Sequence, residues 1–286
     1  MIARASFRAG AGARLCGLAL GVAGLFLPLL AQAGESPWVK TQGAQVRLVT
    51  GGIADGALEA GVEIRLDAGW KTYWRYPGDS GIPPRFDWSG SRNVTGAQVS
   101  FPAPRRFSDG ASGYSIGYKG GTVILPVRVM LEAADKPTRL DLALDFAVCE
   151  ALCVPAQAQV SLDVAPGGGS PNAALAAARA ALPASAPIGA SAPAIASFTL
   201  DRSAQPPVLS VIADTASEKA DLFAEGPSEA WALPVPARAA DGPGRTRFTF
   251  ALDGLPSGAS WKGAQLRLTL VDGARAVETP ITLPKD

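Results

Sequence analysis

Residues 140–164 read LDLALDFAVCEALCVPAQAQVSLDV, and this stretch decides the fold class. From Leu140 to Phe146 an apolar residue occupies every second position, with Asp or Ala between. The same alternation returns from Val160 to Val164. Because successive side chains of a β-strand point to opposite faces, such alternation buries one face and exposes the other. The stretch therefore predicts two strands, with Cys149 and Cys153 between them.

Period-two alternation continues on both sides of this stretch. Further strands are expected over residues 46–49, 62–67 and 122–130, and over 208–213, 245–252, 265–271 and 277–283. Pro126, inside one of them, suggests an edge strand or a bulge. Gly (32) and Pro (24) together make about a fifth of the chain, which favours a turn-rich all-β protein. We expect a β-sandwich followed by a second, smaller sandwich-like domain.

Residues 166–195 interrupt the strand pattern. Pro166-Gly-Gly-Gly-Ser170 predicts a flexible break, and Ser170 is the expected N-cap of a helix over residues 173–182 that Pro183 stops. The expected organisation is a domain over residues 34–165, a helix-containing linker over 166–195 and a second β-rich domain over 196–286.

Residues 1–33 have the three parts of a secretory signal peptide. Residues 1–14 contain three Arg and no acidic residue, and an apolar run follows over residues 15–30. Ala31-Gln32-Ala33 then gives the small-x-small pattern of a cleavage site. We expect cleavage here, loss of Cys16 with the signal, and export to a compartment where disulfides form.

The chain has no His, and this excludes several classes of chemistry. Neither a Ser-His-Asp or Cys-His nucleophile nor a His-ligated zinc, copper or haem site can be built without it. The 26 Lys and Arg against 25 Asp and Glu, without a basic run, argue against a nucleic-acid partner. No cofactor is expected.

The cysteine pair is the main candidate for chemistry, and three interpretations of it stay open. Cys149 and Cys153 form a redox-active dithiol and disulfide, a permanent structural bridge, or a two-thiolate Cu(I) site. A bridge that closes so short a loop removes little entropy from the unfolded chain, so it stabilises the folded state only weakly. Glu150 between the cysteines, and the lack of Lys or Arg in the next ten residues, indicate no strongly acidic thiol.

Two further segments are rich in aromatic residues. Residues 70–76, WKTYWRY, suit either a core strand with Trp70, Thr72 and Trp74 on its inward face or an aromatic wall beside the cysteines. Residues 107–118, FSDGASGYSIGY, combine Gly and Ser with aromatics, as in a loop that packs reversibly over a site.

These residues together resemble the N-terminal periplasmic domain of DsbD-type thiol:disulfide interchange proteins, and in particular the ScsB (suppressor of copper sensitivity) branch. The resemblance is carried by WKTYW at 70–74, PGDSG at 77–81, FDWS at 86–89 and FPAPRRF at 101–107, followed by the cysteine pair. It covers roughly residues 38–165.

The resemblance implies an immunoglobulin-like sandwich that exchanges disulfides in the periplasm. Members of the family take electrons from a membrane-embedded domain and reduce thioredoxin-like proteins. By position, Cys153 is similar to the cysteine that forms the mixed disulfide, and Cys149 to its resolving partner. Tyr73 resembles an aromatic that borders the site, and residues 107–118 resemble a cap loop in which Phe107, Asp109 and Tyr114 are the expected site residues.

This sequence lacks the membrane and thioredoxin domains of full-length members, and its cysteines are closer together than in the best-known domain. We therefore expect a free-standing periplasmic protein of the protein-disulfide reductase type, with an electron donor on another polypeptide. Its expected partner is a thioredoxin-like or other disulfide-bearing protein, in copper tolerance or cytochrome c maturation. The alternatives are a non-catalytic two-domain binding module with a structural disulfide and a Cu(I)-binding protein.

Overall fold

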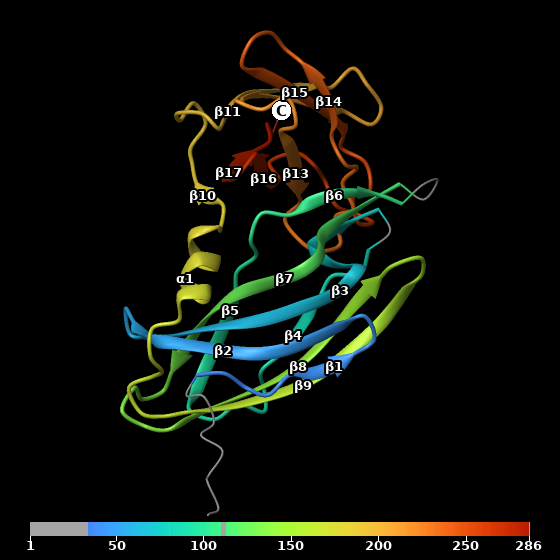
Figure 1. Ribbon diagram of the computed structural model, residues 1–286. Helices are drawn as coiled ribbons and strands as arrows, with labels where there is room; N and C mark the ends of the chain where they lie inside the picture. Colours follow the sequence, from blue (N-terminus) through green and yellow to red (C-terminus); the bar gives the residue numbers. More distant parts are fainter. Residues whose placement is uncertain (1–33, 80, 110–112, 286) are drawn as a thin grey trace, which may run out of the picture. The chain divides into compact units, whose positions relative to one another are not determined.

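The computed structural model describes residues 34–79, 81–109 and 113–285 (Figure 1). The expected signal peptide, with Cys16, lies outside these residues. Everything described below belongs to one compact unit, Ala31–Asp286. Within the described part of the chain, no helix has the length and apolar character needed to cross a membrane.

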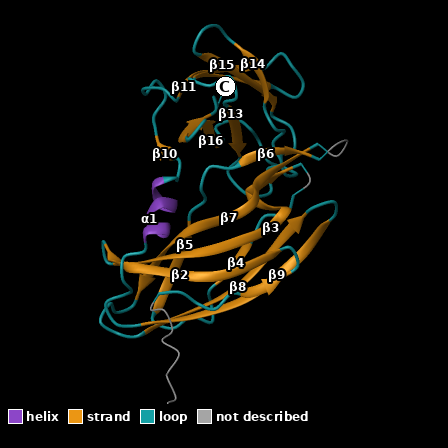
Figure 2. Ribbon diagram, viewed as in Figure 1, coloured by secondary structure: helices purple, strands orange, loops and turns teal. Residues whose placement is uncertain are grey.

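The first half of the chain forms one nine-stranded antiparallel sheet (Figure 2). Its strands are β1 (Val39–Thr41), β2 (Ala44–Ala54), β3 (Ala57–Gly78), β4 (Arg85–Asp87), β5 (Val94–Val99), β6 (Arg105–Ser108), β7 (Tyr114–Leu131), β8 (Thr138–Cys149) and β9 (Cys153–Val164). The main path runs β1-β2-β3-β7-β5, while β8 joins β3, β4 and β9, and β6 pairs with β7. β3 thus connects the strands on the two sides of the core.

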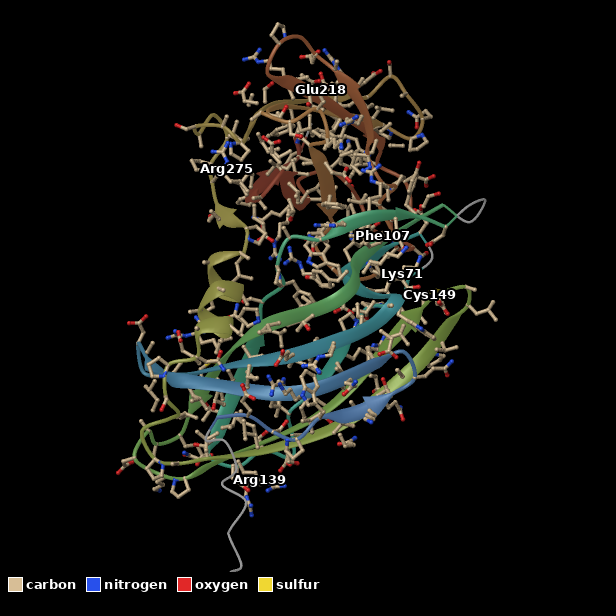
Figure 3. All side chains as sticks on the ribbon, viewed as in Figure 1. Lys71, Phe107, Arg139, Cys149, Glu218 and Arg275 are labelled. Atoms are coloured by element: carbon tan, nitrogen blue, oxygen red, sulfur yellow. A yellow bond between two sulfur atoms is a disulfide. The ribbon has the colours of Figure 1, made fainter. Side chains whose placement is uncertain are left out.

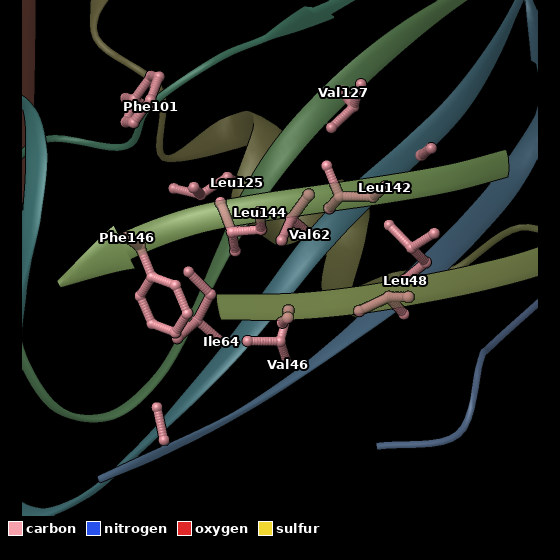
Figure 4. Close-up of a cluster of buried hydrophobic side chains, with 14 of the residues drawn as sticks. Val46, Leu48, Val62, Ile64, Phe101, Leu125, Val127, Leu142, Leu144 and Phe146 are labelled. Carbon is pink, nitrogen blue, oxygen red and sulfur yellow. The ribbon is translucent and has the colours of Figure 1, made fainter. Parts of the chain in front are cut away.

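The core lies between β2, β3 and β7 on one side and β8 and β9 on the other (Figure 4). Leu140, Leu142 and Leu144 of β8 are at most 1% exposed, and the residues between them are only half-buried. The alternation read from residues 140–146 is confirmed. Each of these leucines contributes about 1.5–3 kcal/mol of burial free energy, so the layers are held by non-directional packing of alternate residues.

The edge position suggested by Pro126 is wrong. Pro126 lies inside β7 opposite Gly61 of β3, and β7 also pairs with β5 through Val127 and Val99. The carbonyl of Pro126 accepts a hydrogen bond from Ser100 N at 2.7 Å, on the β5 side. Since a residue in an antiparallel ladder directs its N–H and C=O to the same neighbour, the missing N–H faces the point where β5 has ended. The proline therefore costs the sheet little.

The second half of the chain forms two four-stranded sheets. The β-rich character expected of this region is confirmed. One has the order β10-β17-β16-β13 and the other β11-β12-β15-β14. The strands are β10 (Ala184–Ser185), β11 (Ala194–Asp201), β12 (Val208–Asp214), β13 (Asp221–Glu225), β14 (Ala237–Ala240), β15 (Arg245–Ala251), β16 (Gln265–Asp272) and β17 (Arg275–Thr282). The four strands expected there correspond to β12, β15, β16 and β17.

The linker helix forms, but with a different cap. α1 spans Ala173–Ala180, and its N-cap is Asn172, whose side chain accepts a hydrogen bond from Leu175 N at 3.0 Å. Ser170 also suits an N-cap by residue type, but the chain enters the helix two residues later. Leu175 is 1% exposed and packs against Val49 and Ile124, so this helix is docked on the sheet.

Gly117 provides a test of the close approach between β3 and β7. A Cβ at this position would lie 1.9 Å from the carbonyl oxygen of Thr72. We expect Gly117→Ala to lower the free energy of unfolding by about 2 kcal/mol or more, because backbone strands must separate. The matched control is Gly52→Ala, whose Cβ would meet no atom closer than 3.6 Å. Urea denaturation of both variants checks the prediction, and equal losses would contradict it.

Candidate functional site

The two cysteines lie at the ends of neighbouring strands and form a disulfide. Cys149 ends β8 and Cys153 begins β9, directly opposite each other in the ladder, with Cα atoms 4.1 Å apart. The turn between them is closed by a hydrogen bond of 3.3 Å from Glu150 N to Leu152 O. Cys149 is 4% exposed, whereas Cys153 is exposed to solvent. A reagent or partner therefore meets Cys153 first.

Tyr73 lies against the outer cysteine. Its hydroxyl oxygen is 2.9 Å from Cys153 Sγ, and since a disulfide sulfur carries no hydrogen, the hydroxyl is the donor. Tyr73 is only 3% exposed. Burial, and secondly the negative charge of Asp109, raise the pKa of Tyr73. The phenol therefore stays protonated near neutral pH and is able to donate to a Cys153 thiolate as well.

The pairing of β3 with β8 brings Tyr73 to this position. Lys71 lies opposite Cys149 and Thr72 opposite Val148. The hydroxyl of Thr72 also donates to Ala147 O at 2.8 Å. These bonds fix the path of β3 beside the end of β8, so the next residue, Tyr73, reaches the sulfur without a flexible connection.

Lys71 is a site residue that was not predicted from the sequence. It is 9% exposed, and its Nζ forms an ion pair with Asp109 and donates to Ser115 Oγ at 3.1 Å. Figure 3 shows Lys71, Phe107 and Cys149 at one end of the sheet. Lys71 is far from the cysteines in the sequence and comes beside them through the pairing of β3 with β8. Knowledge of the β3–β8 register would have found it.

The expected cap loop is a hairpin of β6 and the start of β7. Phe107 pairs with Ser115 and Ser108 with Tyr114, and Asp109 N donates to Gly113 O at 2.9 Å. Residues 110–112 lie outside the described part of the chain. Of the three expected hairpin residues, Asp109 joins the site through Lys71, and Phe107 is half-buried in β6. Tyr114 is 42% exposed and lies beside Arg106, whose Cζ is 5.3 Å from the ring centroid.

The aromatic segment of residues 70–76 serves both roles that its sequence allowed. Trp74 is fully buried in the core, with its ring centroid 5.9 Å from that of Phe223. Tyr73, its neighbour on the opposite face, contacts Cys153. Glu150, by contrast, lies over Gly69, where an added Cβ would be 3.1 Å from its carboxylate. Among the described residues, no group of three or more His, Cys, Asp or Glu is placed to hold a metal ion.

Lys71→Met tests whether this cation acts on the thiols. Removing this positive charge from the strand that pairs with Cys149 disfavours a thiolate, so we expect alkylation of the reduced protein to need a higher pH. The measurement is the pH dependence of alkylation of the reduced protein by iodoacetamide. Lys136→Met is the control, since Lys136 is exposed at the opposite end of β8. An unchanged pH profile in Lys71→Met would show that the lysine has no part in thiol reactivity.

Two comparisons find known proteins that are similar to this chain. The family model described as Thiol:disulfide interchange protein DsbD, N-terminal, matches residues 40–165. The fold is similar to that in the crystal structure of the N-terminal periplasmic domain of ScsB from Proteus mirabilis, with a TM-score of 0.68 and 20% sequence identity. That match covers 89% of this chain and 100% of the other. No curated protein matches. Residues 40–165, with the cysteine pair and Tyr73, form an immunoglobulin-like domain that belongs to the DsbD N-terminal family of thiol:disulfide interchange proteins.

Proposed function

We propose that this protein is a periplasmic thiol–disulfide exchange protein that passes electrons from Cys149 and Cys153 to a partner disulfide. The observation that carries the proposal is the asymmetry of the pair: Cys153 is exposed and contacts the Tyr73 hydroxyl, while Cys149 is buried behind it. An exposed sulfur that attacks and a buried sulfur that resolves are the two functions that exchange requires.

The reaction balances as a two-electron exchange. The Cys153 thiolate attacks one sulfur of the partner disulfide, forming a mixed disulfide, and the other partner sulfur leaves as a thiolate. Cys149, deprotonated, then attacks Cys153 Sγ and releases the second partner sulfur. The chain is oxidised to the disulfide, the partner is reduced to the dithiol, and the protons lost by the cysteines go to the partner thiolates through solvent. A separate membrane protein that donates two electrons resets the pair.

Three side chains affect the thiolate in this proposal: two stabilise it and the third opposes them. Tyr73 donates a hydrogen bond to Cys153 when the sulfur carries the charge. Lys71 supplies a positive charge in the strand that pairs with Cys149. Asp109, bound to Lys71, limits that effect. The proposed partner is a thioredoxin-like protein, and copper tolerance or cytochrome c maturation is the proposed setting.

The fold supports exchange over a purely structural bridge. Every residue of β8 from Thr138 to Cys149 is already paired with β9. The disulfide closes the tip of a hairpin that the ladder already holds in the folded protein. Its sequence separation is only 4, so it removes less entropy from the unfolded chain than a bridge between distant residues would, and this favours exchange over a stabilising role.

Trapping of a mixed disulfide tests the order of the two cysteines. We expect reduced Cys149→Ser to form a stable, dithiothreitol-sensitive adduct with an oxidised periplasmic thioredoxin-like protein, because the resolving sulfur is absent. Cys153→Ser is the matched control and should form far less adduct, since Cys149 is 4% exposed. Non-reducing electrophoresis and mass spectrometry give the readout. Equal trapping by both variants would contradict the assigned order, and trapping by neither would contradict the relay.

A further inference from the structure

We propose that strand β13 of the C-terminal region positions the active-site hairpin, and that Arg106 and Asp221 are the positioning residues. The proposal deepens the proposed function, on which it rests, by giving the C-terminal region a role in it. The proposal is based on one short strand, Asp221–Glu225, whose alternate residues contact β3 and β6.

The two faces of β13 enter different cores. Leu222 and Ala224 are buried in the core of the C-terminal sheets. Phe223, which points the opposite way, is 1% exposed and belongs to the core of the nine-stranded sheet. A strand with period-two alternation is normally buried on one face only. Here the second face, Asp221, Phe223 and Glu225, is covered by β3 and β6.

Asp221 and Arg106 join β13 to the hairpin. Arg106 Nη2 lies 2.5 Å from Asp221 Oδ1, and the same guanidinium donates twice to Pro236 O, each time at 3.1 Å. Its Cζ also lies 5.3 Å from the Tyr114 ring centroid. One side chain therefore joins β6, the first residue of β7 and the C-terminal region. Burial raises the pKa of Asp221, and the charge of Arg106 opposes that rise.

The other end of β13 holds β3. Glu225 accepts two hydrogen bonds from Arg75, at 2.8 and 2.7 Å, and Glu278 of β17 accepts a third at 2.5 Å. Arg75 is two residues beyond Tyr73. Between the two ion pairs, Phe223 packs against Trp74. β13 thus contacts β3, which carries Tyr73, and β6, which leads to Asp109.

The hairpin depends on this support because β6 is short and, within the part of the chain that the structure describes, pairs with β7 alone. Its four residues lead directly to Asp109, which binds Lys71. If the Asp221 carboxylate is removed, Arg106 no longer fixes β6 to β13. The position of Asp109, and so its ion pair with Lys71, is then less restricted. The geometry therefore points to a chain of contacts from Asp221 through Arg106 and β6 to the charges at Cys153.

Asp221→Asn in the full chain tests the proposal, with Asp214→Asn as the matched control. Asp214 pairs with Arg245 at 3.0 Å in an exposed ion pair of the same region. In Asp221→Asn we expect amide hydrogen exchange in residues 105–108 to accelerate about tenfold, with β8 and β9 unchanged. We also expect alkylation of reduced Cys153 by iodoacetamide to change about threefold at neutral pH, with a shifted pH profile. Asp221→Glu, which keeps the carboxylate, should restore both readouts.

Arg106→Gln provides the second variant should Asp221→Asn fail to fold, and it should give the same two changes. Results like those of Asp214→Asn would overturn the proposal, and so would uniform acceleration of exchange across all strands, which marks a general loss of stability. Neither readout uses a partner protein. A failed relay in the trapping experiment therefore leaves this test valid, and a negative result here leaves the relay untouched.

Discussion

The pairing of β3 with the end of β8 is the constraint on which the rest of the site depends. Lys71 lies opposite Cys149 in that ladder, and the next side chain of the same face, Tyr73, meets Cys153. β3 continues to Arg75, which forms an ion pair with Glu225 of β13. A single strand thus places Lys71, Tyr73 and Arg75 at fixed spacing along one face. Loops alone would not hold these groups in such a fixed arrangement.

The sandwich core holds β8 firmly, whereas β6 is a short strand. Alternate leucines of β8 fill the core, so the strand that ends in Cys149 has little freedom. Among the described strands, β6 pairs with β7, and side-chain contacts such as that of Arg106 with Asp221 also hold it. A firmly held β8 suits exchange, because the resolving sulfur must stay in place while a partner approaches the outer one. The C-terminal region fits this division by supporting the more weakly held part.

Much of the fold was predictable from local pattern, whereas the surroundings of the cysteines were only partly so. The alternation of Leu140 to Phe146 specified β8, and the resemblance to DsbD-type domains pointed to Tyr73. Lys71 was missed because its distance from Cys149 is set by a long-range register that composition does not contain. Asn172 and Ser170 suit an N-cap equally by residue type, and only the path of the chain selects Asn172. The alternation around Phe223 is the same whichever core its side chain enters. No sequence rule therefore assigns Phe223 to the core of the nine-stranded sheet.

The reduction potential of the Cys149–Cys153 pair tests the central claim most directly. Equilibration of the purified protein with glutathione or dithiothreitol buffers, followed by quantification of free thiols, gives this value. An exchange role predicts a potential above about −300 mV, where the pair is able to cycle with thioredoxin-like proteins. A potential well below about −300 mV would mark a structural bridge and contradict the account.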